Sequence, residues 1–515
     1  MNNKKTSLCA VIDIGSSNIK LRIAQRTKNE MKELERLEQP VGIGHEVFST
    51  GRIGFELLRE ISKILTGFSQ IMSEYGVEQI QAVATTALRE CQNWANVADQ
   101  LMIQNGIHLE ILEETQEKSL IYSEILRRFG EEKLTDFSNT LISYVGTGSI
   151  GVAACNHGEI VLMQNIRIGS VKIHDVLEGV EERTNKFYVV VEEYLNCLLS
   201  DIRKYIEKRS VKELILSGSE FEIIAKHCKV SPKKGIYEIS GKEIQKLYDQ
   251  TKVLSTEKLC ARYDMTEMEG DEFYAVLAIY DRLLKITKAE RVYYINLDIW
   301  DPLTRHMLFF KKGEDELALL KNSVASAEWI AKRYHCDPAH YQFVRARAAD
   351  IFDRTKKFHG LDRKYRLFLE LAAILHECGH YVGSRNHLSA SYDIIRSSEL
   401  YGITREELRL IAILTKYDEH TVPGPGDTDF SSFSEKRRLI ISKLAAILRL
   451  ANALDCSGCE KIDEVKLHVE GQKLVVTCVT DKEIELEQWA FRVCAEFFRD
   501  VFGIKPVCEI KTKLL

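Results

Sequence analysis

LCAVIDIGSSNIKLR, residues 8–22, is the stretch that decides the fold of the first part of this chain. Its apolar run, 8–12, predicts a buried strand, and the alternating run 19–23 predicts a second one. Between them lie Asp13 and the small residues Gly15, Ser16, Ser17 and Asn18. Glycine permits a positive φ, and small polar side chains leave backbone N–H groups free to face an anion. The stretch indicates either a phosphate-binding hairpin, with Asp13 beside it for a metal or a water, or an ordinary hairpin with a tight turn.

A similar pattern returns about 130 residues later. The apolar run 140–145, TLISYV, and the run 150–155 flank a second small-residue loop of Gly146, Thr147, Gly148 and Ser149. A short run at 214–216 ends in a third loop of Ser217, Gly218 and Ser219. Two α/β halves that each begin with such a hairpin predict an internal duplication with a cleft between the halves.

Strands and helices alternate between the first two loops. Residues 31–37, 80–86 and 108–112 predict strands. Apolar residues at helical spacing predict helices at 55–75 and 114–129, and Asn93 can cap a further helix that runs to about residue 104.

The pattern of apolar and polar residues changes near residue 318, where long amphipathic segments begin. They predict helices at 323–334, 338–352, 364–378, 405–415 and 434–454. The last fifty residues predict a small unit of two strands, a helix and a strand. We therefore expect four domains: two α/β halves at 1–130 and 131–312, a helical domain at 313–460 and a small α+β unit at 461–515.

Composition narrows the class of protein. With 45% hydrophobic and 29% charged residues, the chain has the composition of an ordinary soluble protein. A formal charge of −5 argues against a broad nucleic-acid surface, and no apolar run is long enough for a membrane span. The 13 scattered cysteines fit a reduced cytoplasm, and the first fifteen residues do not resemble a signal peptide. Cys456 and Cys459 form an isolated CxxC motif, and the sequence shows none of the further ligands that a zinc site needs.

The order of several motifs resembles the exopolyphosphatase / guanosine pentaphosphate phosphohydrolase (Ppx/GppA) family. AVIDIGSSNIKLRI resembles its first phosphate loop, and VATTALRECQN, residues 83–93, its most specific motif. ILEETQEKSLIY, 111–122, lies where the family has its catalytic glutamate, and IRIGSVKI, 166–173, and the loop at 217–219 follow in order. The resemblance covers nearly the whole chain.

This resemblance implies two duplicated actin-like (ribonuclease H-like) ATPase-type halves, followed by an all-helical HD-like domain. It also implies a cytoplasmic homodimer that releases terminal phosphate from inorganic polyphosphate, or the 5′ γ-phosphate from guanosine pentaphosphate, with Mg²⁺ or Mn²⁺. Neither a nucleic acid nor a membrane is an expected partner.

The site residues follow from the same resemblance. Glu117 would be the general base, Arg89 would clamp a phosphate oxygen, and Asp13 and Glu117 would hold the metal. The three loops would bind phosphate through Gly15, Ser16, Ser17, Asn18, Gly146, Thr147, Gly148, Ser149, Ser217, Gly218 and Ser219. Two alternatives stay open: Arg89 as a salt-bridged surface arginine, and Glu117 as a solvated acid near a helix start that favours negative charge. The second alternative stays open because Lys118-Ser119 stands where the family pattern has Ala-Arg.

The second loop departs from the family pattern. Tyr144 replaces its aspartate and Gly151 its glutamate, and a tyrosine does not bind magnesium as a carboxylate does. Glu113 or Glu114 is a possible substitute. We expect that Tyr144→Asp together with Gly151→Glu raises activity.

The helical domain departs too. His340 and His376 align with the metal ligands of HD domains, but Glu377 replaces an aspartate, and Asp455 is the surviving later acid. The sequence of this domain predicts one of two things. Either a residual metal site remains at His340, His376, Glu377 and Asp455, or the domain serves for dimerisation and as a substrate channel and its histidines have no metal to bind. The whole chain is accordingly a phosphoanhydride hydrolase or, alternatively, a weakened or inactive regulatory protein that binds polyphosphate or (p)ppGpp. A kinase of the actin-like superfamily is disfavoured by the motif at 83–93 and by the HD-like tail.

Overall fold

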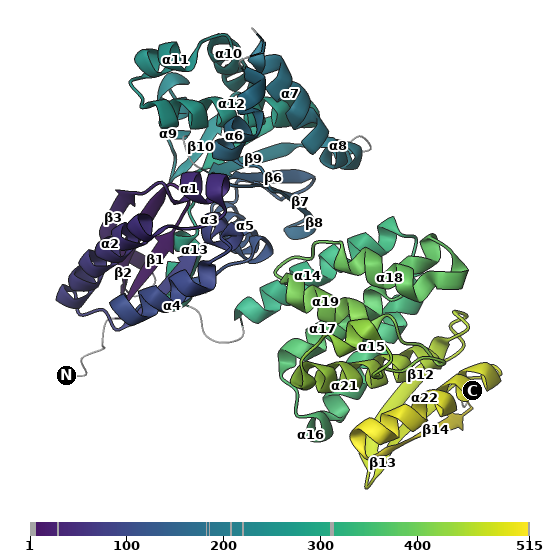
Figure 1. The fold of residues 1–515 in the computed structure, drawn as a ribbon. Helices are drawn as coiled ribbons and strands as arrows, with labels where there is room; N and C mark the ends of the chain where they lie inside the picture. Colours follow the sequence, from purple (N-terminus) through teal and green to yellow (C-terminus); the bar gives the residue numbers. More distant parts are fainter. Residues whose placement is uncertain are drawn as a thin grey trace. The chain divides into compact units, whose positions relative to one another are not determined.

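The opening stretch forms the predicted hairpin at the centre of the first sheet in the computed structural model (Figure 1). Strand β1 (Leu8–Ile14) pairs antiparallel with β2 (Asn18–Thr27), and β2 pairs with β3 (Glu30–Pro40). On the other side, β4 (Gln79–Ala84) and β5 (Leu109–Ile111) continue the sheet in parallel with β1. Strand β1 is buried from its second residue onward because sheet neighbours and helices cover it.

The structure describes residues 7–27, 30–181, 183–184, 186–206, 209–218, 221–309 and 314–512. The predicted loop residue Ser219 lies outside them. The chain divides into two units, Met1–Leu317 and Ala318–Leu515, which are described separately below. No helix among the described residues combines the length and the apolar character needed to span a membrane.

The second sheet contains the second predicted hairpin. Its strands are β6 (Thr140–Val145), β7 (Ile150–Asn156), β8 (Glu159–Ile166), β9 (Glu213–Gly218), β10 (Ile236–Ile239) and β11 (Arg291–Ile295). Read as β8-β7-β6-β9-β11, five neighbouring strands have the order and directions of β3-β2-β1-β4-β5 in the first sheet. The repeat that the sequence predicted is therefore matched by a repeat in strand order and strand direction.

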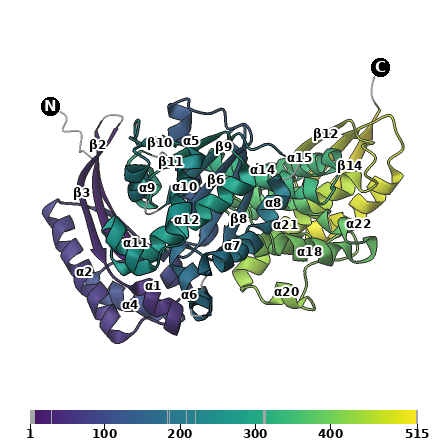
Figure 2. The same cartoon turned by 90° about the horizontal axis from the view of Figure 1, so that it is seen from above.

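Helices flank both sheets of the first unit. They are α1 (Ile43–Thr50), α2 (Phe55–Glu74), α3 (Thr86–Glu90), α4 (Trp94–Asn105), α5 (Glu114–Glu131), α6 (Ser170–Glu181), α7 (Phe187–Leu198), α8 (Ser200–Ile206), α9 (Phe221–His227), α10 (Gly241–Thr251), α11 (Thr256–Tyr263), α12 (Glu267–Thr287) and α13 (Trp300–Phe309). Figure 2 shows α2 and α4 side by side against the first sheet. Helix α13 follows the second sheet in the chain but packs on β1, β2 and α5.

The predicted cap of α4 is wrong in its chemistry. The Asn93 side chain makes no cap hydrogen bond. It accepts a hydrogen bond from the backbone N–H of Ile53 and donates one to the carbonyl of the same residue, at 3.1 and 2.9 Å. This reciprocal pair ties the start of α4 to the loop before α2, which satisfies two backbone groups at once.

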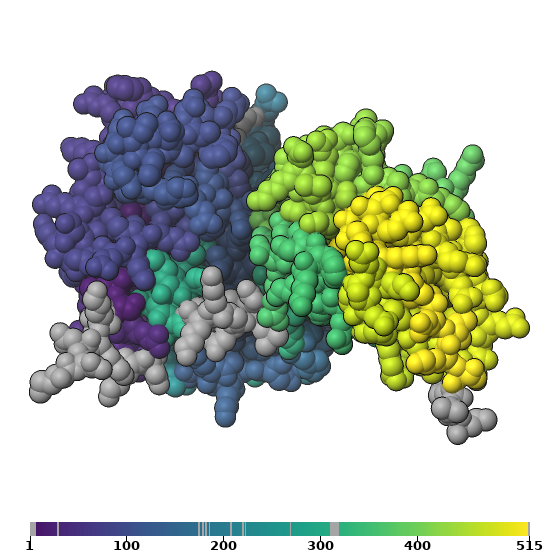
Figure 3. All heavy atoms as spheres, turned by 90° about the horizontal axis from the view of Figure 1, so that it is seen from below, coloured from purple at the N-terminus to yellow at the C-terminus, as the bar shows by residue number. Residues whose placement is uncertain are grey.

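The second unit is helical with a small sheet. Its helices are α14 (Glu314–Arg333), α15 (Pro338–Arg354), α16 (Lys356–His359), α17 (Arg363–Leu375), α18 (His387–Arg396), α19 (Arg405–Leu414), α20 (Thr428–Ser431), α21 (Glu435–Asn452) and α22 (Glu485–Phe502), and its strands are β12 (Glu464–Glu470), β13 (Lys473–Val479) and β14 (Lys505–Lys511). The tail has the predicted order of two strands, a helix and a strand, and lies against the helices (Figure 3, yellow on green). Leu474, Val476 and Phe498 belong to the same hydrophobic core as the helices, so the tail and the helices share one core.

Candidate functional site

The first two predicted loops have the same turn. The backbone N–H of Gly15 donates to the carbonyl of Asn18 at 3.0 Å, and that of Gly146 donates to the carbonyl of Ser149 at 3.0 Å. Each turn joins the two strands of an antiparallel pair, β1 with β2 in the first sheet and β6 with β7 in the second. The two hairpins therefore present equivalent backbone geometry, as the sequence pattern indicated.

Buried oxygens without partners collect in and around these loops. Among the described residues, no hydrogen-bond partner is found for Oδ1 of Asp13 or for Oγ of Ser16, Ser143, Ser149, Ser170 and Ser217. Leaving one such group unsatisfied costs about 1–3 kcal/mol. Several of them at two glycine loops are expected where a bound ligand supplies the missing partners.

The third loop adjoins the second. Ser217 lies opposite Tyr144 in the parallel pair of β9 and β6, and its side chain is fully buried. Gly218 has a φ of +133°, and a Cβ atom there would lie 2.0 Å from the carbonyl oxygen of Val145. Glycine is thus required by both backbone conformation and close approach.

Asp13 lies at the end of β1 in a cluster of acids. Its side chain is buried, and burial, followed by the charge of Asp298, raises its pKa to about 8, while Lys20 opposes the shift. Lys20 also forms an ion pair with Asp298 at 2.6 Å. The sequence reasoning missed Asp298. The available signal was its position just beyond the carboxyl end of the parallel strand β11, where ligand-binding residues of α/β sheets gather.

Arg89 and Glu117, two of the predicted site residues, form an ion pair. Helix α3 carries Arg89, whose Nη1 lies 3.2 Å from Oε2 of Glu117 and donates to the carbonyl of Leu112 at 2.6 Å. Its Nη2 donates to Oγ1 of Thr86 at 3.0 Å. Glu117 is only 5% exposed, so it is not the solvated acid of the alternative interpretation.

Lys118 is a second charged residue to which the sequence reasoning assigned no role. Its ammonium lies 3.0 Å from Oε1 of Glu117 and 4.3 Å from the centre of the Tyr144 ring, and the residue is fully buried. Burial would raise the pKa of Glu117, but the charges of Lys118 and Arg89 lower it below the usual value. Burial lowers the pKa of Lys118. The one signal in the sequence was Lys118-Ser119 in place of the Ala-Arg of the family pattern.

Tyr144 and Gly151 oppose each other in the second hairpin. Burial first, and then the charges of Asp298 and Glu117, raise the pKa of Tyr144 well above its usual value, so the phenol stays neutral. A Cβ atom at Gly151 would lie 2.4 Å from Oη of Tyr122 and 2.9 Å from Cδ of Lys118. The residues beside the second loop therefore do not fit a divalent cation: they offer a neutral phenol, a glycine and an ammonium group.

The other predicted metal ligands of this unit are engaged. Both oxygens of Glu117 contact cationic side chains. Glu114 forms an ion pair with Arg167 at 3.4 Å, and Glu113 takes part in the capping box at the start of α5. Of these carboxylates, only that of Asp13 has a buried oxygen without a hydrogen-bond partner in the described part of the chain.

In the second unit, four helical segments bring the predicted histidines together. Nε2 of His340 and Nε2 of His376 lie 3.3 Å apart, and each is 3.1 Å from Oδ1 of Asn452. Oε1 of Glu377 lies 3.6 Å from Nε2 of His340. The ligand atoms of His340, His376 and Glu377 lie within 4.8 Å of one another, which fits one metal ion.

The opposite nitrogens of the two imidazoles have separate partners. Nδ1 of His340 contacts Oδ2 of Asp455 at 2.8 Å, and Nδ1 of His376 contacts the carbonyl of Ala373 at 2.8 Å. Such contacts fix a histidine so that its other nitrogen faces a metal. Asp455 therefore orients His340 from behind, and Asn452 adds an oxygen atom beside both imidazoles, which the sequence reasoning did not include. A cavity of about 170 Å³ adjoins this cluster and is also lined by His380, His387, Asp418 and Arg449.

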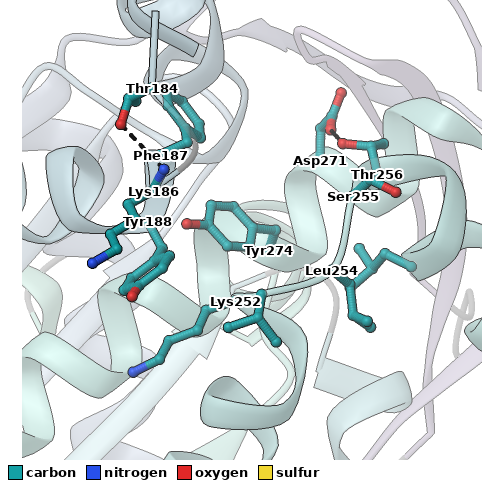
Figure 4. Close-up of a pocket in the computed structure, with 12 residues that line it drawn as sticks. Thr184, Lys186, Phe187, Tyr188, Lys252, Leu254, Ser255, Thr256, Asp271 and Tyr274 are labelled. Carbon is teal, nitrogen blue, oxygen red and sulfur yellow. Dashed lines mark hydrogen bonds between the residues drawn. The ribbon is translucent and has the colours of Figure 1, made fainter. Parts of the chain in front are cut away.

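A different cavity, of about 540 Å³, lies among the helices that cover the second sheet (Figure 4). Lys186, Tyr188, Lys252 and Tyr274 are drawn around it in Figure 4, and Thr256 hydrogen-bonds to Asp271 at 3.0 Å on its far side. None of the residues predicted for the phosphate site lines it.

The chain is similar to proteins of known structure. The solved exopolyphosphatase of Cytophaga hutchinsonii ATCC 33406 has a TM-score of 0.50 and 19% identity, over 59% of this chain and 98% of its own. The Ppx/GppA family member of Aquifex aeolicus has a TM-score of 0.48 and 19% identity, over 58% of this chain and 96% of its own. At this identity, the first likeness shows a shared fold.

Family models match both units. The model of the Ppx/GppA phosphatase family matches residues 22–297, more than half of the chain, and the model of Ppx/GppA phosphatase domain III matches residues 323–492. The first match contains the second and third loops and the Arg89–Glu117 pair, and the second contains the histidine cluster. The chain belongs to the Ppx/GppA phosphatase family.

Proposed function

We propose that the first unit is a phosphoanhydride hydrolase that releases the terminal phosphate of inorganic polyphosphate or the 5′ γ-phosphate of guanosine pentaphosphate. The observation that carries the proposal is the Arg89–Glu117 pair, formed by a partly buried arginine and a buried glutamate, in a unit whose two equivalent glycine turns are surrounded by unpartnered oxygens. Family membership supports it, because members of the family hydrolyse phosphoanhydride bonds.

The residues have separable roles. The loop N–H groups and the hydroxyls of Ser16 and Ser149 would bind phosphate oxygens, and Arg89 would offset their charge. Glu117 is held ionised and fixed, so it would orient the attacking water. Burial, followed by the charge of Asp298, raises the pKa of Asp13 to about 8, so this carboxyl is mostly protonated near neutral pH unless a cation binds beside it. A divalent cation, which the family implies and which would be Mg²⁺ or Mn²⁺, finds a free carboxylate oxygen here only at Asp13 among the acids assigned to this site.

The alternative is a regulatory protein that binds polyphosphate or (p)ppGpp and no longer cleaves it. Tyr144 and Gly151 favour this alternative, because neither supplies the acid of the family pattern. The engagement of both Glu117 oxygens by cations also favours it.

Orthophosphate release distinguishes the two functions. Long-chain polyphosphate and guanosine pentaphosphate are incubated with the full chain and Mg²⁺ or Mn²⁺. We expect Glu117→Gln to lower the rate by about 10²–10⁴-fold, the usual contribution of a positioned acid or base. Glu60→Gln, at an exposed position of α2, is the matched control and should keep the wild-type rate. Wild-type release no faster than that of the Glu117 variant, with ligand binding retained, would leave only the regulatory function.

The second unit supports a further proposal, a divalent metal site. Two imidazole nitrogens, the Glu377 carboxylate and the Asn452 amide oxygen converge, and Asp455 orients His340. Mixed imidazole and oxygen ligands suit Zn²⁺, Mn²⁺ or Fe²⁺. The metal-free domain with leftover histidines is the competing interpretation.

Metal titration of the chelator-treated full chain tests this site. We expect one tight equivalent of Zn²⁺ or Mn²⁺ that His376→Ala removes, while Asp455→Asn weakens binding by about 10–100-fold, as is typical for a residue that orients a ligand. His468→Ala, on the exposed face of β12, is the control. Equal metal content in the wild type and in the His376 variant would refute the site.

We also propose four domains, at 1–130, 131–312, 313–460 and 461–515, and an internal duplication of the two α/β halves. We further propose that the helical domain is HD-like, that it forms a homodimer, and that the protein is cytoplasmic. The equal strand order of the two sheets supports the duplication.

A further inference from the structure

We infer that the ammonium group of Lys118 takes the place of a divalent cation beside the second glycine loop, so that this protein binds a phosphate chain without a metal ion. The inference rests on the proposed phosphate-binding function of the first unit. It concerns binding, and it assigns a role to a residue that the family pattern does not contain.

The position of Lys118 is the first observation. Its Nζ atom lies 3.0 Å from the Glu117 carboxylate and 4.3 Å from the centre of the Tyr144 ring. The same atom lies 3.9 Å from the place of a Cβ atom at Gly146, the first residue of the loop. A positive charge is thus held at the loop by an ion pair and by a cation–π contact.

The second observation is that Tyr144, Gly151 and Lys118 form a matched set. A side chain at Gly151 would approach Lys118 to 2.9 Å and 3.2 Å at Cδ and Cε. An aspartate at position 144 would remove the ring on which the ammonium group lies. Positions 144 and 151, where the acids of the family pattern are absent, are therefore the two positions that accommodate Lys118.

The balance of charges around Glu117 agrees with the proposed role of Lys118. Arg89 and Lys118 carry two positive charges against the one negative charge of Glu117, so this trio has an excess of one positive charge. An excess positive charge repels a metal ion and attracts a phosphate oxygen. The unpartnered hydroxyls of Ser149 and Ser16 add donors that an anion can use.

This inference leads to a different prediction for the double substitution of Tyr144 and Gly151. Tyr144→Asp with Gly151→Glu places the glutamate side chain against Lys118, so the double variant alone should not gain a metal site. Lys118 must be replaced as well. The informative variant is the triple change Tyr144→Asp, Gly151→Glu and Lys118→Ala.

Equilibrium binding tests the inference without any turnover. Fluorescently labelled inorganic polyphosphate and, in a second arm, guanosine pentaphosphate are titrated with the full chain in EDTA and again with Mg²⁺. For the wild type we expect affinities that agree within about threefold in the two conditions. Lys118→Met should weaken binding at least about tenfold in both, and Lys63→Met, at an exposed position of α2, should not.

The outcomes separate the two proposals. Wild-type binding that requires Mg²⁺ overturns the role of Lys118 and leaves the proposed function standing. No binding of either probe in either condition overturns the proposed function, and the inference with it. The triple variant provides the converse measurement: we expect its binding to become Mg²⁺-dependent, and metal-independent binding as tight as that of the wild type would contradict the inference. The wild-type comparison needs no variant, so a folding defect cannot conceal the answer.

Discussion

Glu117 and Lys118 are neighbours in the sequence, and their side chains form an ion pair at 3.0 Å inside the first unit. Motif order predicted Asp13, Arg89 and Glu117 as one site, and the structure brings Arg89 and Glu117 into contact and places Asp13 within the electrostatic reach of Glu117. The order of the motifs could not predict the roles of Lys118 and Asp298. A side chain that replaces a metal leaves no pattern of its own, and the contact between Lys118 and Tyr144 joins residues far apart in the sequence.

At the residue scale, His359 makes the pH dependence of the second unit predictable. Its Nε2 donates to the carbonyl of Phe352 at 2.9 Å, and its Nδ1 accepts from the N–H of Leu361 at 2.8 Å, so the bonded form is neutral. Burial lowers its pKa below the usual 6.5. As the pH falls through about 6.5, the unfolded state takes up a proton first, so the stabilisation is present above that pH and is lost below it.

Hydrogen–deuterium exchange of the segment 350–361 measures this effect. After correction for intrinsic exchange rates, the wild type should lose protection between pH 8 and pH 5, by up to about 1–2 kcal/mol. His359→Gln should begin less protected and should show no comparable extra loss. If protection in the wild type does not depend on pH, His359 does not titrate as described.

At the scale of elements, local patterns predicted the hairpins and the long helices well. The helix expected at 55–75 is α2 (Phe55–Glu74), and the strand expected at 140–145 is β6 (Thr140–Val145), because both have strong apolar periodicity. Helix α13 was not predicted to return to the first sheet. Its position depends on side-chain contacts such as Arg22 with Asp301, at 2.8 Å, between residues nearly 280 positions apart.

Helix α5 shows how an element acquires its role from its surroundings. Its N-terminal turn carries Glu117 and Lys118, and further along Glu124 is buried and accepts hydrogen bonds from Arg127 and Arg128. Arg305 of α13 lies 3.4 Å from the same carboxylate. The helix is therefore anchored by a network of charges, which holds its first turn beside the loops. Sequence spacing predicted the helix but not this network, because burial of charged residues depends on the packing around them.

At the scale of the whole molecule, the chain consists of two units with different chemistry. The first contains unpartnered hydroxyls and cationic side chains, which we propose bind phosphate, and the second contains imidazoles and a carboxylate, which we propose bind a metal. The change in sequence texture near residue 318 predicted the division, since a repeated α/β pattern gives way to amphipathic helices. The shared core of the helices and the C-terminal strands was not predicted, because sequence periodicity does not show which faces pack together.

The most direct test of the central claim is a crystal structure of the full chain with inorganic triphosphate. We predict phosphate oxygens within hydrogen-bond distance of Ser149 Oγ and the loop N–H groups, with Nζ of Lys118 and the guanidinium of Arg89 on the same phosphates. A triphosphate bound instead between Lys186 and Lys252, in the cavity of Figure 4, with the glycine loops unoccupied, would contradict the claim.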